Sequence, residues 1–295
     1  GLVHAHFLFS DGGVAYKLKK NYNIPYVVSV RASDIFTFFS KMIHLRKFGN
    51  EIMREAEQVI FINNSYKELF KKKFFIKSFD DILDKIKIIP NAIDDKWFEI
   101  APIEKVIQKQ ISLLYVGRIV KRKKLDVVIK ALKILNSRPG QKYILEVVGS
   151  GEGSYMAEIR KEADESVIFH GQIMEFDVLL QIYRRSHIFV MPSRKETFGL
   201  VYVEALSQGL PIVYCKNEGV DSFFKNKTVG VAVEPNSAQD VVEGIDHIVE
   251  HYNDLHLKTP EAAKRFNWNK ITHEYVNTYK SITSKKSLTT GNSTK

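Results

Sequence analysis

The chain has 295 residues, of which 44% are hydrophobic and 26% are charged. This composition is typical of a globular protein large enough for two medium domains, and it excludes a disordered chain. The net charge of +10 favours an anionic partner such as nucleotide phosphate, acidic lipid or nucleic acid. Because residues 1–110 and the remainder each carry +5, there is no basic arm, and we expect no nucleic-acid partner.

No apolar run reaches the roughly 20 residues that a membrane-spanning helix needs, and the N-terminus lacks the layout of a signal peptide. We therefore expect a cytoplasmic protein. The single cysteine, Cys215, lies in the strand-like run LPIVYC. It fits either a small buried hydrophobe or a nucleophile, and we assign it no catalytic role.

Short apolar, β-branched runs alternate with segments of helical periodicity, which predicts parallel sheets with crossover helices. In the first part the expected strands are LVHA from Leu2, IPYVVSV from Ile24, QVIFI from Gln58 and KIKIIP from Lys85, separated by amphipathic segments near 13–20, 35–57 and 64–76. A polar segment around 95–110 is expected to be a linker.

A second series of apolar runs follows the linker. Its members are ISLLYVG, YILEVVG, VIFHG, HIFVMP, LPIVYC and VGVAV. Six strands make a complete doubly wound domain, whereas the first part supplies about four, so we expect a truncated first lobe. The predicted fold class is α/β with two Rossmann-like doubly wound lobes.

In open parallel sheets, ligands bind outside the carboxyl ends of strands, and helix N-termini there attract phosphate. The junction after HIFVMP reads SRKETFGLVYVEALSQG, with a helix expected to start at Gly199. Glu196 precedes that helix, and Glu204 lies inside it on a polar stripe with Ser207 and Gln208.

Two glutamates suggest a glycosidase pair, but eight helical residues span about 12 Å and rotate the two carboxylates well apart. Separate binding of separate hydroxyls fits better, because a sugar or ribose diol suits a lone carboxylate acceptor. The alternative is that Glu196 is an ordinary surface glutamate and Glu204 an ordinary glutamate on a helix face, and that neither binds a ligand.

Two further junctions carry candidate residues. After ISLLYVG, Arg118 and Lys123 form a suitable clamp for a diphosphate, although basic runs often face water, as we expect of Lys121, Arg122 and Lys124. After YILEVV, the glycines of GSGEGS predict a tight turn with close backbone approach.

A dinucleotide fingerprint is the alternative for GSGEGS, with its Gly149, Gly151 and Gly153. The spacing is G-x-G-x-G, however, and the next strand ends in His170, where an acidic ribose ligand is expected. The turn KNEGVDS, after LPIVYC, adds Glu218 to the same rim.

In the first part, HAH places His4 and His6 on alternate residues of a strand, and we expect them to point to opposite faces. That arrangement is poor for joint metal binding, so we predict no metal and no cofactor. SVRASD places Arg31 and Asp34 at another strand end, where they are candidates for an acceptor or phosphate contact. A structural role is the alternative for both histidines and the arginine.

Two stretches, FFSKMIHLRKF and LFKKKFF, mix aromatic and cationic side chains. Surfaces of peripheral membrane proteins show this mixture, which makes an anionic membrane surface at the inner face a candidate partner. A packed amphipathic helix gives the same pattern and is the interpretation that we favour.

The motifs resemble those of the retaining glycosyltransferases of family 4, the group 1 glycosyl transferases, which have the GT-B fold. They are GRIVKRKKLDVVIKAL, VVGSGEG, HIFVMPSRKETFGLVYVEALSQGLPIV and FNWNKITHEYVNTY, in the family's order over about 110–283. Within these motifs, the E-x7-E spacing from Glu196 to Glu204 is specific to the family. The first part resembles only the later portion of the family's N-terminal lobe, from VHAH to the PNAID turn.

The resemblance implies two lobes facing a cleft, with a partial acceptor-side lobe at 1–100 and a donor-binding lobe at 110–265. A helix at 266–283 would pack back on the first lobe, and we expect 284–295 to be a frayed tail.

The resemblance also implies residue roles. Arg118 and Lys123 would neutralise the donor diphosphate, Glu196 would hold the donor sugar, and Glu204 would hold the ribose; the first three would take part in catalysis. The other donor-binding residues by motif are Gly117, Gly149, Thr197, Phe198, Gly199 and Leu200, and the acceptor-side candidates are His6, Arg31 and Asp34.

The implied reaction moves a hexosyl-type sugar from a UDP or GDP donor to an acceptor hydroxyl of a glycan or lipid-linked acceptor, with retention of configuration. It would serve cell-surface polysaccharide or glycolipid synthesis, and the positive clamp would stabilise the departing nucleoside diphosphate without a metal. A nucleotide-sugar-binding module without turnover is the alternative.

Three residues depart from the family pattern. Arg31 stands where many members carry histidine, which argues against a histidine-assisted step. Lys124 replaces the glycine that usually follows the clamp lysine, and Ala92 replaces the glycine of the NGxD turn.

Overall fold

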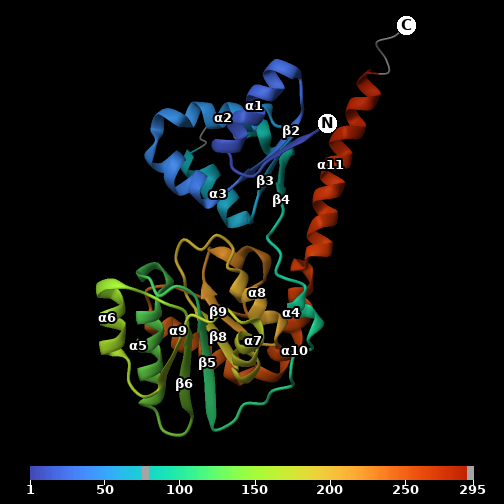
Figure 1. The fold of residues 1–295 in the computed structure, drawn as a ribbon. Coiled ribbons are helices and arrows are strands. Elements are labelled where there is room, and N and C mark those ends of the chain that lie inside the picture. The colour runs from blue at the N-terminus through green and yellow to red at the C-terminus, as the bar shows by residue number, and fades with distance from the viewer. Residues whose placement is uncertain (75–79, 291–295) are drawn as a thin grey trace. The chain divides into compact units, whose positions relative to one another are not determined.

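The computed structural model describes residues 1–74 and 80–290 and divides the chain into two compact units (Figure 1). The first unit consists of residues 1–91 and 268–295, and the second consists of residues 92–267. Each unit is built on a parallel sheet with helices. The predicted α/β class with two Rossmann-like lobes is therefore confirmed.

The first unit has a four-stranded parallel sheet in the order β1-β2-β3-β4, and all four predicted strands are present. β2 is buried along its whole length, which explains its continuous apolar run, because helices cover both faces of parallel sheets. The strands are β1 Val3–Ala5, β2 Tyr26–Val30, β3 Gln58–Phe61 and β4 Ile86–Ile88, and the helices are α1 Ser10–Tyr22, α2 Arg46–Glu55, α3 Asn64–Phe74 and α11 Trp268–Thr290.

Two helical segments differ in extent from the predictions. The segment over 35–57 is divided into a π-helical turn at Asp34–Phe39, a 3-10 turn at Ile43–Leu45 and α2. The C-terminal helix continues to Thr290, because SKKSLTT contains no glycine or proline to end it. The rest of the predicted frayed tail, 291–295, lies outside the described residues. Within residues 1–74 and 80–290, no helix has both the length and the apolar character needed to cross a bilayer.

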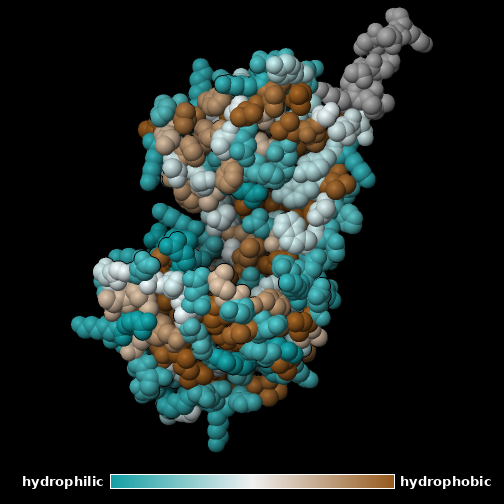
Figure 2. Space-filling view, in the orientation of Figure 1, coloured by the Kyte–Doolittle hydropathy of each residue, from teal (hydrophilic) through white to brown (hydrophobic). Residues whose placement is uncertain are grey.

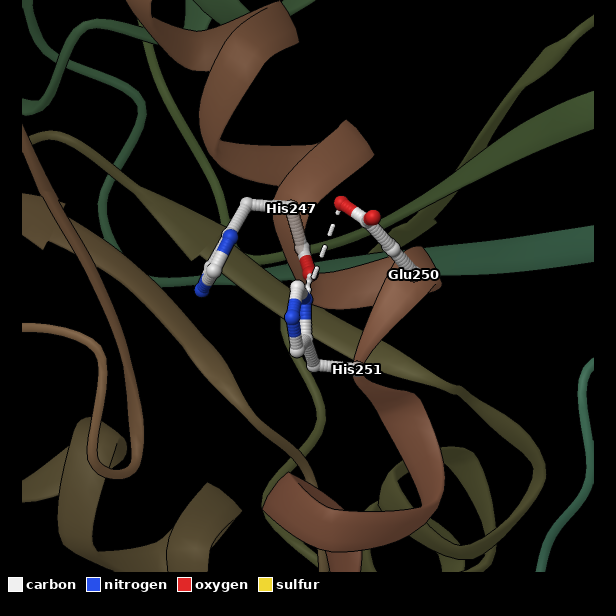
Figure 3. A group of neighbouring side chains, drawn as sticks. All are labelled: His247, Glu250 and His251. Atoms are coloured by element: carbon white, nitrogen blue, oxygen red, sulfur yellow. Dashed lines mark hydrogen bonds and ion pairs between the residues drawn. The ribbon is translucent and has the colours of Figure 1, made fainter.

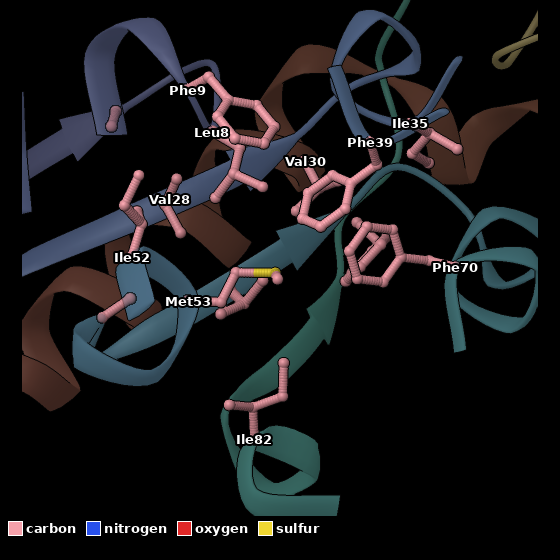
Figure 4. Packing of buried hydrophobic residues seen from close by; sticks show 14 of the residues in the cluster. Leu8, Phe9, Val28, Val30, Ile35, Phe39, Ile52, Met53, Phe70 and Ile82 are labelled. Carbon is pink, nitrogen blue, oxygen red and sulfur yellow. The ribbon is translucent and has the colours of Figure 1, made fainter. Parts of the chain in front are cut away.

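Aromatic side chains form much of the core of the first unit (Figure 4). Phe39 and Phe70 are fully buried, and their rings meet edge to face with centroids 4.7 Å apart. A Cβ atom on Gly49 would lie 2.7 Å from Phe39 and 2.8 Å from Phe9, so only glycine fits there. These phenylalanines of the two aromatic–cationic stretches therefore belong to the core, while Phe75 lies outside the described residues.

The second unit has a six-stranded parallel sheet in the order β10-β9-β8-β5-β6-β7, and all six predicted strands are present. The chain winds outward from β5 to β6 and β7 and then returns to the other side of β5 with β8. Such a reversal is the point at which open α/β sheets bind ligands. The strands are β5 Gln110–Val116, β6 Lys142–Val148, β7 Val167–Gly171, β8 Ile188–Met191, β9 Ile212–Cys215 and β10 Gly230–Val233.

The helices of the second unit lie between its strands and at both ends of the unit. They are α4 Lys96–Glu99, α5 Leu125–Asn136, α6 Gly153–Glu162, α7 Phe176–Arg185, α8 Leu200–Ser207, α9 Ala238–Glu250 and α10 Tyr252–Ala263. The predicted linker around 95–110 holds α4 and then an irregular segment. Lys105 anchors that segment, because its ammonium donates hydrogen bonds to the carbonyls of Tyr183 (3.1 Å) and Ser186 (2.8 Å) at the end of α7. Burial lowers the pKa of Lys105 to about 7.

Candidate functional site

Glycines allow the loops after β5 and β6 to run past one another at close range. Gly149 has a φ of +136°, and a Cβ atom there would lie 2.1 Å from the carbonyl oxygen of Gly117. A Cβ atom at Gly151 would lie 2.5 Å from the carbonyl oxygen of Ile119, whose N–H donates to Ser150 at 2.8 Å. GSGEGS therefore brings two backbone segments together at the carboxyl edge of the sheet.

An ion pair joins the loops after β5 and β8, the two strands between which the sheet reverses its winding direction. We call this reversal the switch point of the second unit. The ammonium of Lys123, after β5, bonds to the carboxylate of Glu196, after β8. The two side chains are only 12% and 11% exposed, respectively. The same loops are also joined by their backbones, because the N–H of Arg194 donates to the carbonyl of Arg122 at 2.8 Å. The sequence predicted two separate ligand groups, and the structure brings them into contact.

The turn after β9 fixes the position of Glu196. The carboxylate of Glu218 accepts the backbone N–H of Glu196 at 3.1 Å, and Gly219 donates its N–H to the carbonyl of Glu196 at 3.0 Å. Gly219 has a φ of +51°, and a Cβ atom there would lie 2.9 Å from the carbonyl oxygen of Phe198. Glu218, predicted at the rim, thus organises this loop, and burial raises the pKa of its carboxyl.

Helix α8 begins at the centre of this loop cluster. Gly199 precedes it with a φ of +79°, and a Cβ atom there would lie 2.4 Å from the ring of Tyr202. The N–H groups of Leu200 and Val201, in the first turn, have no helical acceptor and lie at the positive end of the helix dipole. Of the preceding residues, Phe198 is buried and Thr197 is half-buried. The helix therefore presents an anion-binding end beside the Lys123 ammonium.

Glu204 lies within α8 and accepts a hydrogen bond from the hydroxyl of Tyr183 at 2.9 Å. Burial raises the pKa of Glu204 to about 7, and the Tyr183 bond opposes that rise. The polar residues predicted to share a stripe with Glu204 do not lie at the surface. Ser207 and Gln208 are buried because this side of α8 packs inside the unit, where Gln208 donates to the carbonyl of Trp97 at 2.9 Å.

Arg118, directly after β5, is exposed, and its guanidinium has no ion-pair or hydrogen-bond partner within residues 1–74 and 80–290. Lys121 and Arg122 are exposed as expected, whereas Lys124 is half-buried. Lys124 adopts a left-handed φ of +61° at the start of α5. That conformation explains why glycine suits this position.

His170 takes part in a structural charge network. Its ring bonds to the buried carboxylate of Glu146 at 2.5 Å, and Arg185 binds the same carboxylate through two nitrogens at 2.9 and 2.6 Å. Burial alone would raise the pKa of Glu146, but these bonds lower it below its usual value. Cys215 is buried, and burial raises the pKa of its thiol to about 12, which suits the hydrophobe interpretation.

The expectation that His4 and His6 point to opposite faces was wrong. Residues two apart on a strand share a face, and the two ring centroids lie 4.3 Å apart. The ring nitrogens of His4 bond to the hydroxyls of Tyr279 (2.7 Å) and Ser29 (3.0 Å). Burial, aided by the charges of His6 and Arg31, lowers the pKa of His4 to about 4, so this ring is neutral at pH 7.

Asp34 and Arg31 have different environments. Asp34 is fully buried, and its carboxylate accepts backbone N–H bonds from Arg31 (2.8 Å) and Leu8 (3.2 Å), while burial raises its pKa. This correction gives Asp34 a structural role, because no acceptor can reach a side chain with no exposed surface. Arg31 is half-buried and lies near His6, to whose carbonyl its Nε donates at 3.3 Å.

One group within the described ranges 1–74 and 80–290 has the composition of a metal site (Figure 3). It contains His247, Glu250 and His251, whose ligand atoms lie within 4.8 Å of one another. Because α9 runs antiparallel to the strands, its C-terminal end lies at the amino edge of the sheet. The loops that carry Lys123 and Glu196 lie at the opposite, carboxyl edge. This group is therefore separate from the candidate site, and the expectation of a reaction without a metal stays a prediction.

Solved structures show what this architecture is similar to. Sucrose-phosphate synthase from Thermosynechococcus elongatus superposes with a TM-score of 0.74 at 21% identity, covering 96% of this chain and 74% of that one. Anabaena HepE in complex with UDP superposes with a TM-score of 0.74 at 18% identity, covering 95% and 78%. The fold is accordingly that of the GT-B glycosyltransferases.

Sequence comparison gives the family. An uncharacterized glycosyltransferase of Methanocaldococcus jannaschii is 27% identical, over 95% of this chain and 75% of that protein. The putative teichuronic acid biosynthesis glycosyltransferase TuaC of Bacillus subtilis is 25% identical, over 89% and 64%. Residues 98–266, more than half of the chain, match the family model of glycosyl transferases group 1. The chain belongs to the glycosyl transferases group 1.

Proposed function

We propose that the switch point of the second unit binds a nucleotide-sugar donor and that the protein transfers the sugar with retention of configuration. The observation that carries this proposal is the Lys123–Glu196 ion pair, which joins two strand-end loops beside the N-terminus of α8. A cation, a carboxylate and free helical N–H groups are the complements of a diphosphate and a sugar.

Donor binding exchanges partners within this ion pair. Diphosphate oxygens replace the Glu196 carboxylate on Lys123 and also contact Arg118 and the first N–H groups of α8. The released Glu196 carboxylate then accepts hydrogen bonds from hydroxyls of the donor sugar. Glu204 accepts the ribose hydroxyls as a carboxylate, which its pKa of about 7 makes sensitive to pH near neutrality.

The chemical step depends on stabilisation of the leaving group. As the bond from the anomeric carbon to the diphosphate breaks, negative charge grows on the diphosphate, and the fixed positive groups stabilise it. The acceptor hydroxyl attacks from the face that the diphosphate leaves and gives its proton to the departing phosphate. Nothing in this scheme requires a metal.

The names of related proteins guide the choice of substrates. HepE was solved with UDP and with UDP-glucose, so UDP is the first nucleotide to test and GDP the second. TuaC and a Klebsiella pneumoniae protein of the cps region support a role in cell-surface polysaccharide synthesis. We place the reaction at the cytoplasmic side of the membrane, with an anionic lipid surface as a further candidate partner.

The test is calorimetric titration of the chain with UDP and with GDP. We expect one nucleotide to bind, and we expect Arg118→Gln and Glu204→Gln to weaken it by about tenfold or more, the scale of a hydrogen bond with a charged group. Arg138→Gln is the matched control, because Arg138 pairs with Asp246 on an exposed surface of the same unit. Absence of binding to a folded chain, or equal weakening by the control, contradicts the proposal.

A further inference from the structure

A cavity of about 390 Å³ lies in the first unit, at the carboxyl ends of its strands and against α11. Its lining includes His6 after β1, Arg31 after β2 and Asn91 after β4, together with Trp268 and Tyr275 of α11. The size falls within the roughly 300–1,000 Å³ of small-molecule sites, and the position follows the rule for open parallel sheets.

The charge of this cavity is unbalanced. Its lining contains no acidic side chain, and Arg31 forms no ion pair within residues 1–74 and 80–290. The polar contacts of Arg31 are with uncharged groups: the carbonyl of His6 at 3.3 Å, the side chain of Asn91 at 3.4 Å and the hydroxyl of Tyr275. The carboxylate of Asp34 accepts backbone N–H groups instead. A half-buried guanidinium of this kind is suited to an anion.

Part of the cavity lining is aromatic. Trp268 is 51% exposed at the start of α11, although tryptophan is usually a largely buried residue. Tyr275 lines the same cavity two helical turns further on. Aromatic rings offer a flat apolar surface for the C–H face of a pyranose, which inorganic phosphate lacks.

We propose that this cavity binds a negatively charged sugar unit of the acceptor, through Arg31 at its phosphate or carboxylate group and Trp268 at its ring. The assignment of this cavity to the acceptor rests on the proposed glycosyl transfer. The binding itself belongs to the first unit, so it is testable without a nucleotide. The shared chemistry is an anionic sugar, and the probes below distinguish phosphate from carboxylate.

The experiment titrates the 295-residue chain, without nucleotide, with glucose 6-phosphate, glucuronate, glucose and inorganic phosphate. We expect at least one anionic sugar to bind about tenfold or more tightly than both glucose and phosphate. Binding should change the tryptophan fluorescence, and Trp268→Phe should remove that change, because the other tryptophan, Trp97, is buried in the second unit.

Variants locate the binding. Arg31→Gln should lose tenfold or more in affinity, and Arg31→Lys should recover part of it, since lysine keeps the charge but lacks the guanidinium fork. Arg54→Gln is the matched control in the same unit, where Arg54 lies on the surface 3.7 Å from Asp81. Arg118→Gln, in the second unit, should leave the affinity unchanged.

Three results overturn the proposal: equal affinity for phosphate and sugar phosphate, no loss in Arg31→Gln, or loss in Arg118→Gln instead. Absence of saturable binding to a chain that is folded by circular dichroism overturns it as well. If UDP binds through Arg118 while anionic sugars do not bind, only this inference fails. If anionic sugars bind through Arg31 while UDP and GDP do not, the donor assignment fails and the cavity remains a sugar site.

Discussion

The two units build their strand-end sites in different ways. In the second unit the sheet reverses its winding direction, and the loops on either side of the reversal supply both charges of an internal ion pair. In the first unit the described strands follow one direction, and the cavity is closed by a helix from the far end of the chain. A ligand must therefore separate existing partners in the second unit, whereas Arg31 in the first has no carboxylate to release.

The largest effect on stability should come from the glycines that shape the candidate site in the second unit. We expect Gly149→Ala to destabilise the second unit by about 3 kcal/mol, because the new Cβ atom would overlap the Gly117 carbonyl at a strained positive φ. Gly140→Ala, at φ +96° with nothing within 4 Å, should cost only about 1 kcal/mol. Urea unfolding in a Trp268→Phe background, followed through Trp97, measures both; equal costs contradict the close approach.

The ion pair predicts opposite effects from its two members. Lys123→Met should weaken UDP binding by about 10- to 100-fold, because a charged hydrogen-bond donor is lost. Glu196→Gln should tighten UDP binding severalfold while lowering turnover, because the diphosphate no longer competes with a carboxylate. Calorimetry and sugar-transfer assays check both, with the surface residue Lys133 as control in Lys133→Met. A change in the same direction for both variants would show that the pair does not open on binding.

Glu204 should make the free energy of unfolding of the second unit change by about 2 kcal/mol between pH 5 and pH 7. A carboxyl whose pKa rises on folding, here to about 7, stabilises the folded state below its unfolded pKa, and that stability is lost as pH rises through 7. We therefore expect Glu204→Gln to gain stability relative to the unmodified chain between pH 5 and pH 7. Denaturant unfolding at the two pH values measures the difference.

The comparison with the variant is necessary because other groups titrate in the same range. Burial lowers the pKa values of His4 and His187 to about 4. These two histidines therefore have the opposite effect, because through them the folded state loses stability as the pH falls. The exposed Glu158 serves as control, and Glu158→Gln should show no such pH-dependent gain. A gain of the same size in the control contradicts the assignment to Glu204.

The smallest expected effect is at Lys124, whose left-handed φ is strained for a residue with a side chain. Lys124→Gly should stabilise the second unit by about 0.5 kcal/mol, since relief of that strain exceeds the extra entropy of glycine in the unfolded chain. Lys133→Gly, within α5, should instead destabilise it by about 1 kcal/mol. Thermal unfolding distinguishes a gain from a loss.

The sequence was sufficient to predict all ten strands, because parallel strands covered on both faces read as continuous apolar runs. It also located the loops after β5 and β8. It could not predict that Lys123 and Glu196 touch, because they are 73 residues apart and meet only through the placement of β8 beside β5. The cavity was missed for a related reason, since Trp268 joins His6 only in the folded first unit.

The division of the chain also has a consequence for synthesis. The second unit is an insertion within the first, whose last helix, α11, follows residue 267, and Tyr279 of that helix bonds to His4. On a ribosome adding about 5–20 residues per second, the wait between residue 91 and α11 is on the order of 10–30 s. During that interval the strands of the first unit lack the helix that contacts His4, so the first unit can complete its fold only after the whole second unit has been synthesised.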